Sequence, residues 1–354
     1  MLSKIISIIQ YGYTPLQLAN YFKYKANKRT KTLLNYRPLW MLVYVTDLCN
    51  LHCKMCPHHT MADSSKFSQA KKLNTDFISL ETLDFSFNKF PESYFVMLAG
   101  VGEPLLHPQF KEIIHMCEKH HKKVKIVTNG TRLTEEMSDF LTTSRCIDEI
   151  QVSLNAPDYE TYYDICQGSA DEFYNVAKNI RGLVFAKHRN KSPLIIVTSA
   201  VCGDEFKEKA YSFLCFADSL GVDRIELFRY IDFGIVGNDI SDIKSDREYI
   251  HELDKKAKGK IKAQYYLPHL VGDSTFKSQC DWFWKNISID SSGNIGSCGR
   301  VISPDSSYGN VFSDEDVWNN AYMQKVRMMF LEGEVLPSNC CWACVENNCQ
   351  EEVL

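Results

Sequence analysis

The chain has 354 residues, of which 45% are hydrophobic and 24% are charged, and its formal net charge is -4 at pH 7. This composition is that of a globular protein, and the small negative charge excludes a nucleic-acid binder that relies on bulk positive charge. No apolar run approaches the roughly 20 residues that span a bilayer, and the apolar N-terminus lacks a small-residue cleavage site. We therefore expect a cytoplasmic protein without nucleic-acid binding or membrane association.

Residues 1–38 predict one or two helices and a basic connector. From residue 40, short apolar and β-branched runs alternate with longer helical patterns. Strands that alternate with helices indicate βαβ units and a parallel sheet, which right-handed crossovers curl into a barrel. Six repeats are too few for a closed eight-stranded barrel, so we expect an open, six-stranded partial (β/α)6 barrel over residues 39–235. The expected strands are 41–45, 94–99, 124–128, 149–154, 194–201 and 224–228, and the expected helices are 108–120, 134–141, 170–187 and 205–220.

The chain after the barrel divides into two further regions. Residues 236–277 are polar with a helical pattern, and we expect a helical bridge. Residues 278–354 form a separate C-terminal extension in this interpretation. Within it, ISIDSSGNIGSCGR predicts a β-hairpin, because two short strand patterns flank a Ser-Ser-Gly-Asn turn. A helix is expected over 314–331, before the cysteine-rich end.

Fourteen cysteines are many for a protein of a reducing compartment, where metal binding is the usual explanation. Cys49, Cys53 and Cys56 follow the first expected strand directly, at the edge of a parallel sheet where ligands and chemistry collect. Zinc and iron–sulfur sites normally take four protein ligands. Either a nearby histidine completes a zinc site, or the fourth position is left open for a bound cofactor.

The run CNLHCKMC resembles the CxxxCxxC signature of the radical S-adenosylmethionine (SAM) enzymes. The resemblance implies a [4Fe–4S] cluster held by Cys49, Cys53 and Cys56, with one iron open to the amino and carboxylate groups of SAM. Such a cluster reductively cleaves SAM to a 5′-deoxyadenosyl radical, which abstracts hydrogen from a substrate C–H bond. A reductant such as flavodoxin or ferredoxin would supply the electron.

Further motifs at the strand ends resemble the SAM-binding motifs of this family. The run GVGEP after the second strand is similar to the family's GGEP motif, in which glycines let the backbone approach the ligand. Its glutamate is expected to be a structural acceptor or an acceptor for the methionine ammonium. Polar residues after the third and fourth strands would reach the ribose and the methionine carboxylate, and an apolar residue between the cysteines would border the adenine. The implied SAM-binding residues are Met55, Gly100, Gly102, Glu103, Asn129, Ser153 and Asn155.

The C-terminal cysteines resemble the extension called SPASM, or its shorter form, twitch. A full SPASM extension holds two auxiliary clusters, but six cysteines cannot fill eight ligand positions. The resemblance therefore implies one auxiliary [4Fe–4S] cluster, and a structural zinc is the alternative. In this interpretation Cys340 is an alternative to Cys341 as a ligand, and Cys349 binds no cluster. The implied auxiliary ligands are Cys280, Cys298, Cys341 and Cys344.

The reaction depends on what meets the substrate radical. An auxiliary cluster would accept an electron and give net oxidation, whereas a thiol such as Cys202, at the end of the fifth strand, would return hydrogen and give epimerisation. A plain buried thiol is the simpler interpretation of Cys202. The segment before the first strand is too short for the recognition domain of many peptide-modifying relatives. We therefore expect oxidation of a sugar, cyclitol or other small polar metabolite, with a peptide substrate or a non-catalytic iron–sulfur or zinc protein as alternatives.

Overall fold

The computed structural model of the chain describes residues 12–27, 30–56, 58, 77–231, 246–268, 280–296 and 307–333. Its strands form one ten-stranded sheet in the order β10-β9-β8-β1-β2-β3-β4-β5-β6-β7. Neighbouring strands from β1 to β6 are all parallel, which confirms the expected parallel α/β sheet. Each expected strand is present to within two residues at either end. These six strands are β1 Trp40–Tyr44, β2 Phe95–Ala99, β3 Lys123–Thr128, β4 Ile147–Ser153, β5 Ile195–Cys202 and β6 Arg224–Arg229.

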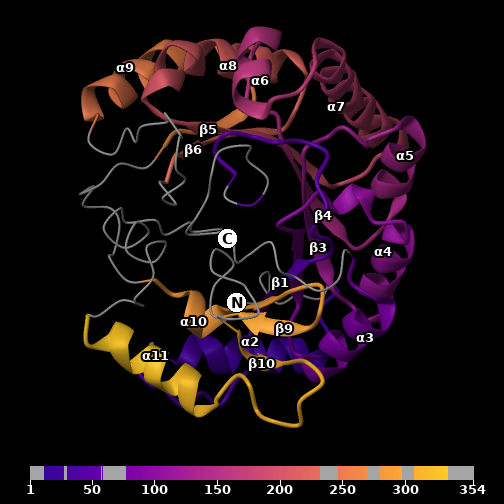
Figure 1. Cartoon of the computed structure of the whole chain (residues 1–354), viewed down its shortest axis with the longest axis vertical. Helices are drawn as coiled ribbons and strands as arrows, with labels where there is room; N and C mark the ends of the chain where they lie inside the picture. The colour runs from indigo at the N-terminus through magenta and orange to yellow at the C-terminus, as the bar shows by residue number, and fades with distance from the viewer. Residues whose placement is uncertain are drawn as a thin grey trace, which may run out of the picture.

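The helices that connect these strands lie on the outer side of the curved sheet (Figure 1). The helical patterns predicted α4, α5, α7 and α8, but they missed α3 and α6. None of the described helices is both long and apolar enough to cross a bilayer. The connecting helices are α3 Leu80–Lys89, α4 Phe110–Lys119, α5 Glu135–Thr143, α6 Tyr159–Cys166, α7 Ala170–Asn190 and α8 Lys207–Ser219.

The sheet is longer than the six strands expected from the sequence. In the expected bridge, α9 (Arg247–Ala257) precedes β7 (Gln264–Tyr266), and β7 pairs in parallel with β6. In the extension, β8 (Asn286–Ile289) pairs in parallel with β1 and antiparallel with β9 (Asn294–Gly296). The predicted hairpin is therefore present, and it covers the edge of β1 that a six-stranded sheet would leave unpaired.

The rest of the described extension completes this edge. Strand β10 (Ser307–Asn310) pairs antiparallel with β9, and the short helix α10 (Trp282–Lys285) precedes β8. Helix α11 (Ala321–Leu331) begins later than the expected start at residue 314. The reason is local, because the Asn320 side chain accepts a hydrogen bond from the Met323 N–H and caps the helix there.

The barrel strands have one apolar face and one mixed face. On β3, Ile126 is fully buried, and on β4, Ile150 is fully buried. These side chains face the helices, so their neighbours Lys125 and Glu149 point to the inner side of the curve. The same alternation on the other strands gives an inner face whose main side chains are Leu42, Tyr44, Met97, Lys125, Glu149, Gln151, Ser199, Arg224 and Glu226.

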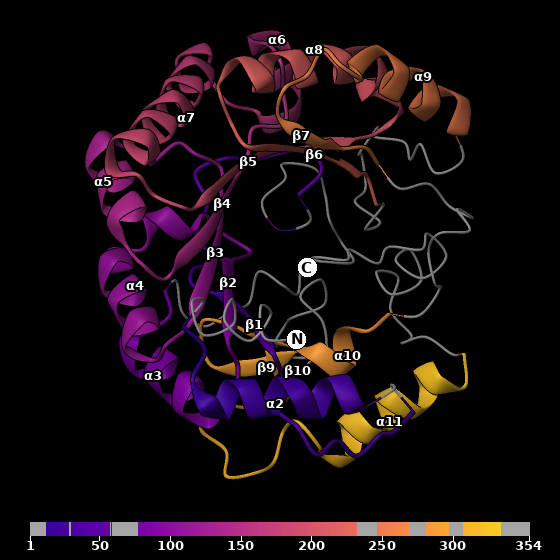
Figure 2. The same cartoon turned by 180° about the vertical axis from the view of Figure 1, so that it is seen from behind.

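The N-terminal helix α2 (Pro15–Ala26) lies beside the C-terminal extension, at the β10 end of the sheet (Figure 2). The Asn20 side chain binds both the backbone N–H and the backbone carbonyl of Arg37, at 2.8 and 3.0 Å. From the other side, the Trp318 indole N–H donates to the Tyr36 carbonyl at 2.8 Å. The segment that leads into β1 is therefore held between helix α2 and the C-terminal extension.

Candidate active site

The three cysteines of the CxxxCxxC motif lie on the loop that follows β1, at the carboxyl edge of the parallel sheet. The loop turns sharply at its end, where the Cys56 N–H donates to the Cys53 carbonyl at 2.9 Å. Between these residues, the Lys54 N–H donates to the Ile165 carbonyl at the end of α6, at 2.8 Å. All three cysteines are partly exposed residues, so part of the loop can be reached by a cofactor.

The glycines of the GVGEP run let two loops cross. A Cβ atom on Gly102 would lie 2.2 Å from the Leu48 carbonyl oxygen, so only glycine fits there without a shift. Backbone hydrogen bonds join the two loops at this point, from Gly102 to Thr46 at 3.0 Å and from Glu103 to Leu48 at 2.8 Å. The close approach expected at Gly102 is thus an approach to the cysteine loop itself. Gly100 is less restricted, because a Cβ there would meet its nearest atom, the Thr46 oxygen, at 3.3 Å.

Glu103 is a buried link between β2 and β3. One carboxylate oxygen accepts from the Thr128 hydroxyl at 2.6 Å and from the Leu105 N–H at 3.0 Å, and the other accepts from the Asn129 N–H at 2.6 Å. The side chain is 2% exposed, and burial raises its pKa while these hydrogen bonds lower it. Of the two roles expected for Glu103, this geometry supports the structural one.

Asn129, after β3, holds the cysteine loop from the other side. Its amide donates to the Asn50 side-chain oxygen at 2.9 Å, and the Asn50 amide donates to the Thr131 hydroxyl at 3.0 Å. Thr131 in turn donates to the Asn129 side-chain oxygen, at 2.7 Å from its hydroxyl. One member of this ring of hydrogen bonds, Asn50, directly follows Cys49 in the sequence. The motifs did not identify Asn50 or Thr131 as site residues.

Ser153 and Asn155 follow β4 at the same edge. Ser153 is opposite Ser199 on β5 and is partly exposed, as a ligand contact requires. Asn155 is buried and has a left-handed backbone, with φ of 59°. Its side-chain oxygen accepts from the Val201 N–H at 3.2 Å, and its own N–H donates to the Ser199 carbonyl at 3.1 Å. Asn155 therefore ties β4 to β5, and its contacts are those of a structural residue.

Cys202 lies on the helix-facing side of the sheet, opposite Arg229 of β6. Its side chain is fully buried, its thiol lies 3.9 Å from the Gly203 carbonyl oxygen, and burial raises its pKa to about 12. A hydrogen donor for a substrate radical must face the inner side of the barrel, so this geometry does not support that role for Cys202. The simpler interpretation, a buried thiol in the core, agrees with its surroundings.

The thiols of the cysteine loop differ in their surroundings. Burial raises the pKa of the Cys49 thiol to about 12, and the charges of Cys53, Glu103 and Cys56 add to this rise. The pKa of Cys53 is raised by a hydrogen bond with the Cys166 thiol of α6 and by burial. Within the described residues, no three side chains of the metal-binding types converge on one point. A thiol that binds iron does so as the thiolate, so cluster binding must release these protons.

The donor set nevertheless fits a cluster with one open iron. One accessible loop carries three thiols, and its two flanks are fastened by Gly102 and Asn129. Met55 lies between the last two cysteines and packs partly buried against the core, as an apolar neighbour of an adenine ring would. In the second cysteine group, Cys280 is partly buried just before α10. The other members lie outside the described residues, namely Cys298, Cys340, Cys341, Cys344 and Cys349.

Two residues of α6 were not singled out from the sequence. Tyr162 and Cys166 are both fully buried in the same core against which Cys49 and Cys53 pack. No motif marks them, because they lie more than a hundred residues after the cysteine loop and meet it only through the fold.

The fold and this loop define a parallel α/β protein with a three-cysteine site at the carboxyl edge of an open barrel. Residues 43–195 match the model of the radical SAM superfamily, so this part of the chain is a radical SAM domain. Such a domain implies a [4Fe–4S] cluster and SAM as cofactors, in agreement with the expectation from the sequence.

Similar proteins include the antilisterial bacteriocin subtilosin biosynthesis protein AlbA of Bacillus subtilis (strain 168). It is 24% identical over 82% of this chain and 61% of its own length. The mycofactocin maturase MftC of Mycobacterium ulcerans (strain Agy99) is 27% identical over 45% of this chain and 39% of its own. A tungsten-containing aldehyde ferredoxin oxidoreductase cofactor-modifying protein of Pyrococcus furiosus is 34% identical over 28% of this chain and 26% of its own. The chain thus spans less than two thirds of each of these relatives.

Solved structures share the fold at low sequence identity. Streptococcus suis SuiB bound to S-adenosylmethionine has a TM-score of 0.66 and 17% identity, over 87% of this chain and 71% of that one. SuiB bound to the precursor peptide SuiA gives the same TM-score, 0.66, at 16% identity, over 87% and 70% of the two chains. The protein anSMEcpe with bound AdoMet and Cp18Cys peptide has a TM-score of 0.63 and 15% identity, over 89% and 91%.

Proposed function

We propose that this chain is a radical SAM enzyme that acts on a peptide. In this proposal, Cys49, Cys53 and Cys56 hold a [4Fe–4S] cluster, and the observation that carries it is their placement on one fastened, accessible loop at the carboxyl edge of the barrel. When bound, the cluster supplies the electron that cleaves SAM to a 5′-deoxyadenosyl radical, which abstracts hydrogen from the substrate.

The residues around the loop position its thiols. Gly102 allows the neighbouring loop to press against Leu48, directly before Cys49, and two backbone hydrogen bonds fasten it there. Glu103 and Asn129 fix the loop that follows β3, which in turn holds Asn50. A rigid support of this kind keeps the open side of the site in a constant position relative to the inner face of the barrel.

The inner face offers a substrate two different walls. On β1 and β2, Leu42 and Tyr44 form an apolar cluster against which Met97 and Ala99 pack, together with Trp282 of α10. On the facing strands, Lys125 and Glu149 form an ion pair at 2.8 Å, and Arg224 pairs with Glu149 and, at 2.6 Å, with Glu226. A peptide, with an amide backbone and mixed side chains, matches walls of both kinds better than a uniformly polar sugar does.

The relatives favour the same substrate class. AlbA is named for the biosynthesis of a bacteriocin, and solved structures with this fold contain SuiB with a precursor peptide and anSMEcpe with a peptide. The sugar or cyclitol expected from the sequence is not supported. The segment before β1 is too short for a peptide-recognition domain, which is why the sequence favoured a small metabolite. The length of this segment does not determine what binds to the inner face of the barrel.

We further propose that the second cysteine group holds one auxiliary [4Fe–4S] cluster. Cys280 would be one ligand, and it packs against the core immediately before α10, whose Trp282 reaches the inner face. The remaining ligands would be Cys298, Cys341 and Cys344. An acceptor at this end of the inner face would take an electron from a substrate radical, so net oxidation is the favoured outcome.

The test is anaerobic reconstitution followed by assays for iron and for SAM cleavage. Reduced wild-type protein should convert SAM to 5′-deoxyadenosine and methionine, and Cys53→Ala should abolish this because a cluster ligand is lost. Cys117→Ala is the matched control, since Cys117 is buried between α4 and the sheet. Cleavage that survives in Cys53→Ala would refute the assignment. Deuterium transfer from a labelled candidate peptide into 5′-deoxyadenosine would then identify the substrate.

A further inference from the structure

The C-terminal end of α6 packs directly against the cysteine loop. The Lys54 N–H donates to the Ile165 carbonyl at 2.8 Å, and the Lys54 ammonium pairs with Asp164 at 2.6 Å. Two contacts from one loop residue to one helix end fix the middle of the CxxxCxxC motif. The side chains that this helix turns inward therefore lie on the side of the helix end that meets the cysteine loop.

One of these inward side chains is Cys166, the last residue of α6. Its side chain is 0% exposed, and its thiol interacts with the thiol of Cys53 and raises the pKa of Cys53. An S–H group is a weak donor, and a thiolate is a better acceptor than a thiol. When Cys53 becomes a thiolate on iron, Cys166 is in place to donate to it.

The other inward side chain is Tyr162, one turn before Cys166. It is 0% exposed, and its hydroxyl has no hydrogen-bond partner among the described residues. A buried hydroxyl without a partner loses its hydrogen bonds to water and gains none in return, so such a group calls for an explanation. Tyr162 lies one turn from Ile165, whose carbonyl accepts the Lys54 N–H of the cysteine loop at 2.8 Å. Burial raises the pKa of this hydroxyl, and the charges of Cys166, Cys53 and Cys49 add to the rise.

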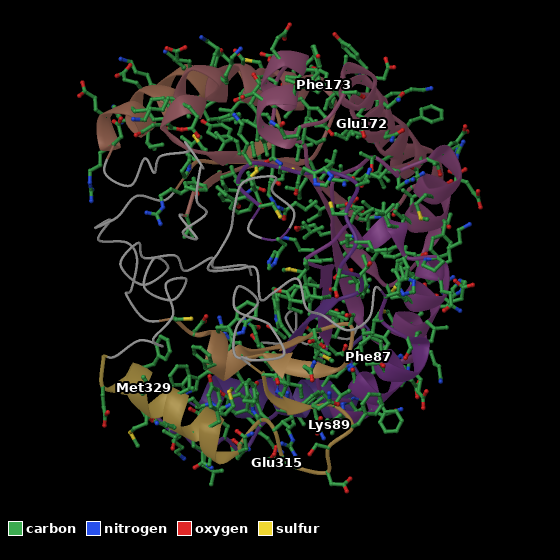
Figure 3. The ribbon with its side chains drawn as sticks, viewed as in Figure 1. Phe87, Lys89, Glu172, Phe173, Glu315 and Met329 are labelled. Atoms are coloured by element: carbon green, nitrogen blue, oxygen red, sulfur yellow. The ribbon has the colours of Figure 1, made fainter. Side chains whose placement is uncertain are left out.

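The Tyr162 ring is held firmly in this orientation. A Cβ atom on Gly168 would lie 2.4 Å from the ring carbon Cε1, so the chain after α6 closes on the ring. The Phe173 ring lies 5.6 Å away, centre to centre, on α7 (Figure 3). A locked ring with an unpartnered hydroxyl, on the helix that contacts the cysteine loop, is preorganised to donate a hydrogen bond once an acceptor is bound there.

We propose that Tyr162 and Cys166 are positioning residues that donate hydrogen bonds to the sulfur atoms of the cluster held by Cys49, Cys53 and Cys56. A donor stabilises the reduced cluster more than the oxidised one, because the reduced cluster carries more negative charge on its sulfur atoms. The two side chains therefore raise the reduction potential of this cluster, which hydrogen bonds to sulfur are known to tune. This inference depends on the proposed cluster but not on the substrate.

The experiment is a redox titration of the reconstituted protein, followed by electron paramagnetic resonance in the absence of SAM and substrate. Tyr162→Phe and Cys166→Ala should each make one-electron reduction three- to tenfold less favourable, and tenfold corresponds to about 59 mV. Tyr162→Phe keeps the packed ring, so it decides the question if Cys166→Ala impairs folding. An exchangeable proton coupled to the reduced cluster should also disappear in Tyr162→Phe.

The chain contains a matched control pair. Cys202 and Tyr249 are another neighbouring cysteine and tyrosine, but they lie on the helix-facing side of the sheet. Cys202→Ala and Tyr249→Phe should leave the potential at the wild-type value. Equal potentials in all four variants and in the wild type would overturn this inference alone. A wild-type protein without any cluster signal would overturn the proposed function as well.

Discussion

Gly102→Ala is the substitution that most directly tests how the cysteine loop is supported. The new Cβ would lie 2.2 Å from the Leu48 carbonyl oxygen and 2.7 Å from two further Leu48 backbone atoms, while real Cβ contacts almost never fall below 3.0 Å. All three atoms belong to the backbone, so no side-chain rotation relieves the clash. The segment just before Cys49 must move away from the loop that follows β2.

The size of the effect follows from what this movement breaks. Two backbone hydrogen bonds join the loops, at 3.0 and 2.8 Å, and each contributes about 0.5–1.5 kcal/mol. With the strain of overpacking, the free energy of unfolding should fall by about 2–4 kcal/mol. A domain of ordinary stability, about 5–15 kcal/mol, survives this loss. The variant should therefore fold but bind much less iron at the first cluster.

The assay compares urea unfolding of the cluster-free protein with the iron content after reconstitution. Gly100→Ala is the matched control, because its Cβ would meet atoms only at 3.3 Å or beyond and should cost less than about 1 kcal/mol. If Gly102→Ala and Gly100→Ala had the same stability and the same iron content, the role assigned to the loop crossing would be refuted.

Three further predictions test other parts of the structure. Cys280→Ala should lower the iron content of the reconstituted protein from about eight atoms to about four if an auxiliary cluster is present, and stoichiometric zinc in the wild type would contradict this. Arg224→Met should cost about 1–3 kcal/mol, because Glu226 loses its ion-pair partner and Glu149 keeps only Lys125. Burial raises the pKa of Glu226, and Arg224 opposes that rise. Without Arg224 the ionised carboxylate is destabilising, so the loss of stability in urea unfolding should be larger at pH 8 than at pH 5. An equal loss at both pH values would argue against this role of Arg224. Cys202→Ala should not change the stereochemistry of the product, and loss of a solvent-derived deuterium from product carbon in this variant would restore the hydrogen-donor role.

Much of the barrel was predictable because its elements depend on local patterns. Buried parallel strands are short apolar runs, and β3 and β5 were found from these runs to within one residue at either end. The CxxxCxxC spacing likewise identified the cysteine loop, since chemistry at one strand end requires few residues close in sequence. Helix α6 was missed because it has only eight residues, too few for a clear periodic pattern.

The sequence by itself determined the parallel α/β class, the cysteine loop after the first strand and the family. The tertiary structure decided which way each side chain faces, and this changed the interpretation of several residues. Cys202 ends its strand on the helix side, Glu103 is enclosed by three donors, and the hairpin of the extension pairs with β1. It also brought the end of α6, which carries Tyr162 and Cys166, to the cysteine loop from more than a hundred residues away. Such contacts depend on the register of strands and the packing of helices, which a linear pattern of residues does not specify.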